Sequence, residues 1–155
     1  MIADMVQAEG DPAAPRAAER VTWALRQADI AVQALKEQRL RPLGIAGAHY
    51  SLLMSVHAEP GLTGAELARR LGVTPQAVAS LIARLEDQGQ VERRPHPRHR
   101  NVQELYLTEA GRDALRPADA ELAAIEDQIT RHLAPGDAVQ LVALLGKIAD
   151  ATRGA

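Results

Sequence analysis

Two short helices joined by a two-residue connection are predicted between residues 63 and 89. Thr63 begins the first helix, because its hydroxyl can accept a hydrogen bond from the amide of Glu66 while the Glu66 carboxylate reaches back to the Thr63 amide. The second helix begins at Thr74, whose hydroxyl can cap it, and continues with Pro75, which has no N–H to leave unpaired in the first turn. Since only a Gly-Val pair separates the two helices, they must cross sharply.

The spacing of apolar residues divides both helices into a buried face and an exposed face. Aliphatic residues recur three and four positions apart and are expected to face one another: Leu67, Ala68, Leu71, Val78, Leu81, Ile82 and Leu85. The opposite face of the second helix is small and polar: Gln76, Ala77, Ser80, Ala83 and Arg84. Such a face can enter the major groove of B-DNA, about 12 Å wide, where Gln, Ser and Arg side chains reach base edges. We therefore predict a helix-turn-helix that reads duplex DNA.

Two extended segments follow this helix-turn-helix. Gly89 ends the second helix, and residues 90–95 and 102–107 are predicted as strands because the prolines in and after the first segment exclude a helix. Leu105 and Leu107 alternate with Glu and Tyr, which is the period of a half-buried strand. The two strands would form a hairpin wing beside the helices.

Positive charge is concentrated in the loop of this hairpin. Residues 91–100 carry four Arg and one Glu, a net charge of +3, so the loop can lie on phosphates or insert an Arg into a narrow minor groove. Over residues 60–112 eight Arg oppose six acidic residues, whereas the whole chain has a formal net charge of −2. The predicted DNA-contacting residues are Thr63, Thr74, Gln76, Ala77, Ser80, Arg84, Arg94, Arg98 and Arg100.

Residues 63–111 resemble the helix-turn-helix and wing of the MarR family of bacterial transcription regulators. The resemblance rests on the segments GLTGAELARRLGVTPQAVASLIARLEDQG, VERRPHP and LYLTEAG, and the flanking helices extend it to about residues 18–152. The wing of that family usually carries an Asp-x-Arg pair, whereas the matching positions here are His99 and Asn101. The resemblance implies a mainly α fold: a winged helix-turn-helix with a small β-hairpin wing, flanked by N- and C-terminal dimerisation helices.

Apolar stripes on the flanking segments support the predicted dimerisation helices. One stripe of the first segment has three- and four-residue steps: Val21, Leu25, Ala28, Val32 and Leu35. The last helix is apolar on two faces: Val139, Leu141, Val142, Leu144, Leu145 and Ile148. A small winged-helix core cannot cover all of these side chains, so we expect a twofold copy to cover them in a homodimer. Ordinary packing within one chain is the alternative.

Four regions follow from this organisation. They are a flexible tail (1–15), N-terminal helices for dimerisation and a cleft (16–58), the DNA-binding winged helix-turn-helix (59–112) and C-terminal dimerisation helices (113–155).

The resemblance further implies a repressor that leaves a near-palindromic operator when a small phenolic or anionic effector binds between the dimerisation helices and the DNA reader. Side chains that could line such a cleft, with an aromatic wall and a hydrogen-bond donor, are Trp23, His49, Tyr50 and Met54. Each of them could instead be an ordinary core residue. The expected partners are therefore double-stranded DNA, a second copy of the chain and a small effector.

Other functions receive less support from the sequence. The absence of Cys excludes disulfides and thiol sensing by this chain. No nucleophile elbow, phosphate-binding Gly-rich loop or carboxylate pair indicates catalysis, so neither an enzyme nor a cofactor is expected. His49 and His57 are eight residues apart, too far for an i, i+4 metal pair, so no metal site is expected. Two alternatives stay open: a winged-helix module that binds a protein partner, and a zinc-responsive regulator.

The expected location is the cytoplasm, with no membrane contact. The N-terminal residues include Asp4, Glu9 and Asp11 and lack an apolar core, and no uninterrupted apolar run of about 18 residues occurs.

Overall fold

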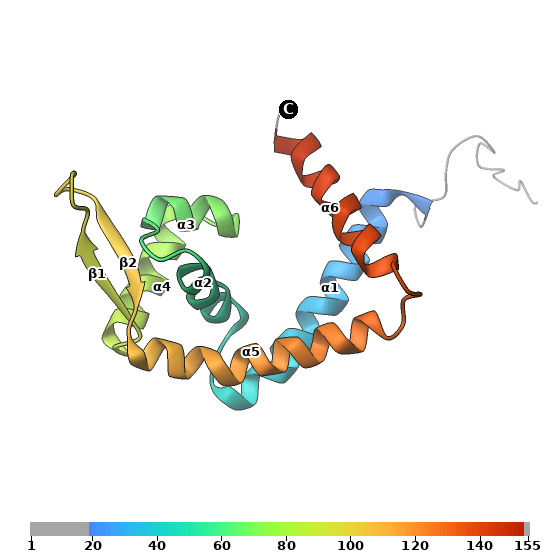
Figure 1. Cartoon of the computed structure of the whole chain (residues 1–155), viewed down its shortest axis with the longest axis horizontal. Helices are drawn as coiled ribbons and strands as arrows, with labels where there is room; N and C mark the ends of the chain where they lie inside the picture. Colours follow the sequence, from blue (N-terminus) through green and yellow to red (C-terminus); the bar gives the residue numbers. More distant parts are fainter. Residues whose placement is uncertain (1–18, 154–155) are drawn as a thin grey trace, which may run out of the picture. The chain divides into compact units, whose positions relative to one another are not determined.

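The structure is a computed structural model that describes residues 19–153. The predicted tail, residues 1–15, lies outside the described residues. The chain divides into two units, residues 1–35 and residues 36–155. The elements are α1 (Val21–Leu40), the 3-10 helix η2 (Arg41–Leu43), α2 (Gly47–Ala58), α3 (Gly64–Leu71), α4 (Pro75–Asp87), β1 (Val91–Pro95), β2 (Gln103–Leu107), α5 (Glu109–Thr130) and α6 (Asp137–Arg153) (Figure 1).

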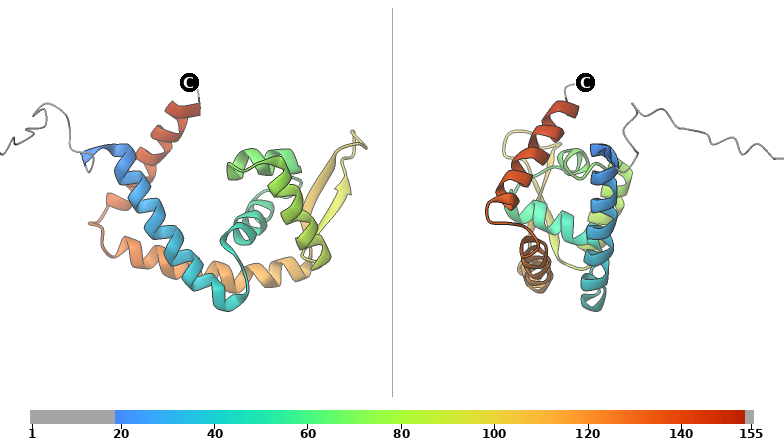
Figure 2. Two further views of the ribbon diagram at one scale, coloured as in Figure 1. Left: turned by 180° about the vertical axis from the view of Figure 1, so that it is seen from behind. Right: turned by 90° about the vertical axis from the view of Figure 1, so that its right-hand side faces the viewer.

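The predicted mainly α fold with one small hairpin is confirmed. β1 and β2 pair antiparallel with Val91 opposite Leu107 and Pro95 opposite Gln103. Each strand begins one residue later than predicted: the Gln90 amide donates to the Leu85 carbonyl and the Val102 amide donates to the His99 carbonyl, both in turns. The helices α2, α3 and α4 lie on the same side of the hairpin in both Figure 1 and Figure 2.

The helix-turn-helix begins with the predicted capping box. The Thr63 hydroxyl accepts from the Glu66 amide at 3.3 Å, and the Glu66 carboxylate accepts from the Thr63 amide at 2.8 Å. α3 ends at Gly72, whose φ of 66° lies in the left-handed region that glycine adopts without a Cβ clash. α4 then begins with the Thr74 hydroxyl accepting from the Ala77 amide at 3.1 Å. Both helix starts are as predicted from the sequence.

A single aliphatic core holds the reader together. Its buried members come from α2, the α2–α3 connection, α3, α4, both strands and the first half of α5: Leu52, Leu53, Val56, Leu62, Leu67, Ala68, Val78, Ile82, Leu85, Val91, Leu105, Leu107 and Leu115. Leu71 and Leu81 are half-buried and pack against this cluster, so all seven predicted helix-turn-helix core residues contribute to it. Burial of apolar area is the main source of stability for such a core.

Leu105 also ties the hairpin to the connection between α2 and α3. Its amide donates to the Leu62 carbonyl at 2.9 Å, and its carbonyl accepts from the Gly61 amide at 2.9 Å. This isolated bridge between Leu62 and Leu105 adjoins the hairpin. It fixes the position of β2 relative to the segment that leads into α3.

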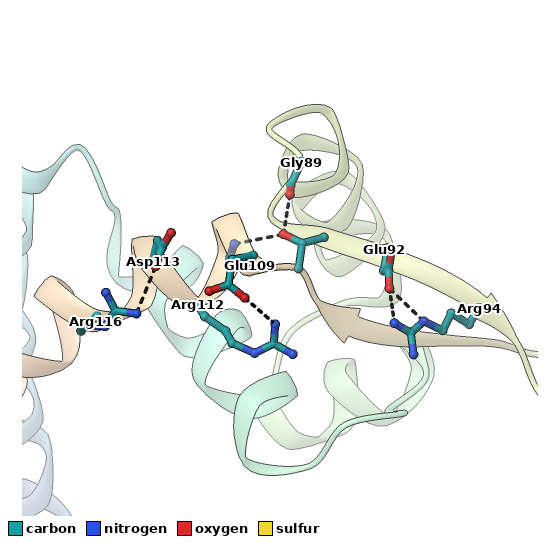
Figure 3. A network of polar contacts seen from close by, with 9 residues as sticks. Gly89, Glu92, Arg94, Glu109, Arg112, Asp113 and Arg116 are labelled. Carbon is teal, nitrogen blue, oxygen red and sulfur yellow. Dashed lines mark hydrogen bonds and ion pairs between the residues drawn. The ribbon is translucent and has the colours of Figure 1, made fainter.

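The start of α5 closes the wing. The Thr108 hydroxyl accepts from the Gly111 amide at 3.0 Å and donates to the Gly89 carbonyl at 2.5 Å (Figure 3). The Thr108 amide also donates to the Gln90 carbonyl at 3.1 Å. Thr108 therefore caps α5 and joins it to Gly89, two residues after the end of α4.

The first unit contains most of α1. This helix begins at Val21, not at residue 16 as predicted, and residues 16–18 lie outside the described residues. Val21, Trp23 and Ile30 are 62%, 49% and 47% exposed.

In the second unit, α6 exposes several large apolar side chains: Val139, Leu141, Val142, Leu144 and Leu145. The two most exposed are Val139 at 77% and Val142 at 68%. Within residues 19–153, no helix is both long and apolar enough to cross a lipid bilayer.

Candidate nucleic-acid interface

The outward face of α4 is the first part of the candidate site. Val78, Ile82 and Leu85 anchor the helix in the core, which turns the opposite side to solvent because an α-helix repeats every 3.6 residues. The predicted base-reading residues all lie exposed on that side: Gln76, Ala77, Ser80 and Arg84.

The polar side chains on this face of α4 have no partners among the described residues. Gln76 and Ser80 form no side-chain hydrogen bond with any described residue, and Arg84 forms neither a side-chain hydrogen bond nor an ion pair within residues 19–153. Unpaired donors and acceptors on an exposed helix are available to base edges and phosphates. The polar side chains on this face of α4 are therefore available to contact DNA, because no other described residue occupies them.

Two predicted contacts, Thr63 and Thr74, have their hydroxyls occupied in helix caps. The Thr63 hydroxyl donates to the Glu66 carboxylate at 2.8 Å besides accepting from the Glu66 amide. The hydrogen bonds from Thr63, first from its amide and then from its hydroxyl, lower the pKa of the Glu66 carboxyl. A phosphate contact by either threonine stays a prediction.

The arginines of the wing fall into two groups. Arg93 forms an ion pair with Glu86 at 2.9 Å, which joins β1 to α4. Arg94 pairs with Glu92, and its guanidinium lies 4.4 Å above the centre of the Tyr106 ring. Figure 3 shows the Arg94 side chain directed at Glu92. The predicted DNA contact of Arg94 would require its guanidinium to leave Glu92 or to bridge it and a phosphate.

Arg98 and Arg100 form the second group. Both are exposed in the loop between the strands, and neither makes an ion pair or a side-chain hydrogen bond with the described part of the chain. Free guanidinium groups at the end of a hairpin are well suited to phosphate or minor-groove contact. These two are the wing residues whose side chains the structure leaves ready for DNA.

Sequence reasoning missed one residue of the wing, His96. Its ring accepts hydrogen bonds from two backbone amides of the loop, at Arg98 and His99. The signal was present in the sequence, because His96 precedes Pro97 and a residue before proline is held in an extended conformation. An acceptor on that residue can then reach the amides two and three positions further on, as Asn and Asp do in turns.

The residues predicted for an effector cleft lie in different surroundings. A cavity of about 190 Å³ is lined by residues of η2, α2, the α4–β1 connection and α5, among them Leu43, His49, Leu53, Gln88, Gln90, Ala114 and Pro117. Tyr50 and Met54 do not line it. Met54 packs against the core, and the Tyr50 hydroxyl donates to Asp119 of α5 at 3.3 Å. Trp23 belongs to the first unit.

Burial and charge shift the pKa values of His49 and Tyr50, two of the titratable residues of α2. Burial, followed by the positive charge of Arg84, lowers the pKa of the His49 imidazole. The lowered pKa favours the neutral imidazole, and part of the shift comes from Arg84, a side chain of the predicted DNA-reading face. Burial, then the charge of Asp119 and the hydrogen bond to it, raises the pKa of Tyr50 to about 12, so Tyr50 remains a hydrogen-bond donor.

Among residues 19–153 no group of three or more His, Cys, Asp or Glu side chains is placed to hold a metal ion. His49 and His57 lie on α2 without a third ligand among these residues.

Sequence comparisons agree with the geometry of the reader. A model of the MarR family matches residues 43–100. The HTH-type transcriptional repressor Rv2887 of Mycobacterium tuberculosis (strain H37Rv) is 34% identical over 94 residues, which is 61% of this chain and 68% of that protein. The HTH-type transcriptional repressor Mb2911 of Mycobacterium bovis matches with the same identity and the same coverage.

Solved structures match over more of the chain. The transcriptional repressor CouR bound to a 23-mer DNA duplex has a TM-score of 0.77 at 28% identity, covering 85% of this chain and 94% of that one. Rv2887 of Mycobacterium tuberculosis in complex with salicylic acid has a TM-score of 0.68 at 27% identity, covering 83% of this chain and 96% of that one. Together with the winged helix-turn-helix described above, these matches show that the chain belongs to the MarR family of transcription regulators.

Proposed function

We propose that this protein is a dimeric transcriptional repressor that reads a near-palindromic DNA operator and is released from it by a small effector. The observation that carries the proposal is the exposed and uncommitted set of side chains on α4 beside the free arginines of the wing loop, Arg98 and Arg100. The helix supplies base contacts and the loop supplies phosphate contacts. Sequence specificity and salt-dependent affinity would thus come from separate elements.

A dimer is proposed from the surface of α6. Val139 and Val142 stand one helical turn apart and are each more than half exposed, and a strip of this kind is usually covered by a partner. Twofold symmetry would place two α4 helices about 34 Å apart, one turn of DNA, which matches two half-sites.

An effector is proposed for the cavity that His49 lines. The structural relative Rv2887 was solved with salicylic acid, a small phenolic anion. The cavity of about 190 Å³ suits a ligand of that size better than a drug-sized one. The walls come from α2, α5 and the α4–β1 connection, so an anion bound beside His49 would act on the position of α4. Tyr50 and Met54 do not line this cavity, and effector contacts by Trp23, Tyr50 and Met54 stay predictions from the sequence.

A regulatory role in the cytoplasm, without catalysis, accompanies this proposal. The relatives are named as transcriptional repressors, and a repressor acts where the DNA is. The protein-interaction alternative predicts that α4 and the wing do not discriminate between DNA sequences.

The experiment is a selection of binding sites from a randomised duplex library with the wild-type protein, followed by affinity measurements for Ser80→Ala and Arg84→Ala. If these side chains meet bases, each variant loses discrimination at one base pair, by about 1–3 kcal/mol. Arg116→Ala is the matched control, because Arg116 is exposed on α5 and pairs with Asp113. A library that yields no enriched sequence with wild type would remove the repressor proposal in favour of the protein-interaction module.

A further inference from the structure

The loop of the wing is closed by its own backbone. It begins at His96, the first residue after β1, whose amide donates to the Val102 carbonyl at 2.8 Å. Within the loop the Val102 amide donates to the His99 carbonyl at 2.8 Å, which makes a tight turn over residues 99–102. These bonds fix the ends of the loop but leave the amides of Arg98 and His99 without a backbone acceptor.

The His96 imidazole supplies that acceptor. Its Nδ1 accepts from the Arg98 amide at 3.0 Å and from the His99 amide at 3.1 Å. An imidazole nitrogen can accept only when it carries no proton, so these two bonds assign the proton of His96 to Nε2.

The other side of the ring faces β2. Nε2 lies 3.6 Å from a Glu104 carboxylate oxygen, and the other Glu104 oxygen accepts from the Tyr106 hydroxyl at 2.8 Å. Glu104 is thus held by a strand neighbour and faces the imidazole N–H. The contacts from Tyr106 to Glu104 and from Glu104 to His96 orient the imidazole ring so that its Nδ1 points into the loop.

We propose that His96 is the positioning residue of the wing, which orders the backbone of residues 98–100 so that Arg98 and Arg100 are presented to DNA phosphates. The inference rests on the proposed DNA-binding function and deepens it. Positions 99 and 101 are His and Asn, so no Asp–Arg ion pair between them can order this loop. The arginines themselves form no side-chain hydrogen bond or ion pair with residues 19–153, so their placement depends on the backbone that His96 holds.

The geometry identifies the part of His96 that matters. Nδ1 is bonded to Cγ, as is Oδ1 of asparagine, so His96→Asn keeps an acceptor at the same distance along the side chain, in an ordinary Asx turn. His96→Phe keeps an aromatic ring of similar shape and loses both ring nitrogens. Comparison of the His96→Asn and His96→Phe variants therefore separates the effect of the hydrogen-bond acceptor from the effect of the aromatic ring.

His99→Ala is the matched control. The His99 ring lies 5.1 Å from the His96 ring, tilted by 31°, but its side chain forms no hydrogen bond within the described residues. Its removal keeps the His99 amide and therefore both bonds to His96.

The test measures affinity for operator DNA and for random duplex at several salt concentrations. We expect His96→Phe to weaken binding to both duplexes by roughly 10-fold and to lower the salt slope by about 1–2, the share of one to two phosphate contacts. His96→Asn and His99→Ala should stay near wild type in both readouts. Amide hydrogen exchange at residues 98 and 99 should accelerate in His96→Phe and stay slow in His96→Asn.

A triple variant decides whether His96 acts through the two loop arginines, Arg98 and Arg100. In a background with Arg98→Ala and Arg100→Ala, His96→Phe should have no further effect on affinity, because nothing is left to position. Equal affinity and salt slope for His96→Phe and wild type would overturn the inference, as would a full additional loss in the arginine-free background. Failure of wild type itself to bind any duplex would instead overturn the proposed function, so the two failures are distinguishable.

Discussion

Gly111 of α5 lies directly against the backbone of Gln90, so closely that a Cβ added at Gly111 would stand 2.0 Å from the Gln90 carbonyl oxygen. Gly111 is fully within the helix and buried, so its role is not a special backbone conformation but the absence of a side chain. The contact allows the Thr108 hydroxyl to bridge the start of α5 and Gly89. The wing and α5 therefore meet backbone to backbone.

Replacing Gly111 by Ala is expected to destabilise the fold by about 1–3 kcal/mol, because the added methyl group forces two backbone segments apart. Urea denaturation measures the change. Gly64→Ala is the control, since its added Cβ would meet the Ile82 side chain at an ordinary 3.6 Å. A Gly111→Ala variant as stable as wild type would show that the junction is not closely packed.

Thr108→Val should cost about 1–2 kcal/mol of stability, because it removes the cap of α5 and the bond to the Gly89 carbonyl together. Thr130→Val is the control. The Thr130 hydroxyl only donates to carbonyls one turn back in the same helix, and its loss should change stability by less than about 0.5 kcal/mol. Similar losses in thermal denaturation of the two variants would contradict the bridging role of Thr108.

His49 gives the stability a pH dependence with a definite sign. Burial first and Arg84 second lower the pKa of His49 in the folded protein, so the unfolded chain takes up the proton first as the pH falls. The stability is complete above the ordinary imidazole pKa of about 6.5 and is lost as the pH falls through the lowered folded value. The urea midpoint of wild type should therefore fall more between about pH 7.5 and about pH 5.5 than that of His49→Gln.

The matched control for this prediction is His57→Gln, which changes an exposed histidine on the same helix. It should keep the wild-type pH dependence. The same pH dependence in His49→Gln and wild type would mean that His49 titrates alike in the folded and unfolded chains.

The arginines of the wing should differ in their effect on DNA binding. Arg98→Ala and Arg100→Ala are each expected to lower the salt slope by about 0.9, with equal loss on operator and random duplex. Arg94→Ala should have a smaller effect, because Arg94 is shared with Glu92 and Tyr106. Arg93→Ala, whose partner is Glu86, is the control and should leave the slope unchanged. An Arg93 effect as large as that of Arg98 would contradict this ranking.

Val142→Asp on α6 tests the dimer. A carboxylate in a buried apolar interface is strongly unfavourable, so the variant should become monomeric in analytical ultracentrifugation at micromolar concentration and lose affinity for a two-half-site operator. Gln140→Asp adds the same charge at an exposed polar position of the helix and should remain dimeric. If both variants sediment like wild type, α6 does not form the interface.

The local part of this fold was predictable because its signals are local. The caps at Thr63 and Thr74 depend on residues within one helical turn. The extended segments follow from prolines and from the alternation that buries Leu105 and Leu107. Exposure of the outward face of α4 followed from helical period alone.

Features that depend on tertiary contacts were not predictable. Nothing in the sequence near Arg94 says that Glu92 and Tyr106 will hold its guanidinium, because that requires the strand register. The approach of Gly111 to Gln90 joins residues on either side of the whole hairpin. His96 is intermediate, since the following proline restricts it but the loop decides which amides its ring meets. The effector residues were proposed together, yet of those on α2 His49 alone lines the cavity.

The most direct test of the account is a binding titration of the purified protein on the duplex upstream of its own coding sequence, at two salt concentrations, with random duplex as competitor. A dimeric repressor should bind the upstream duplex in preference to random DNA, with an affinity that falls steeply with salt. Binding to neither duplex at low salt would contradict the claim that α4 and the wing form a DNA reader.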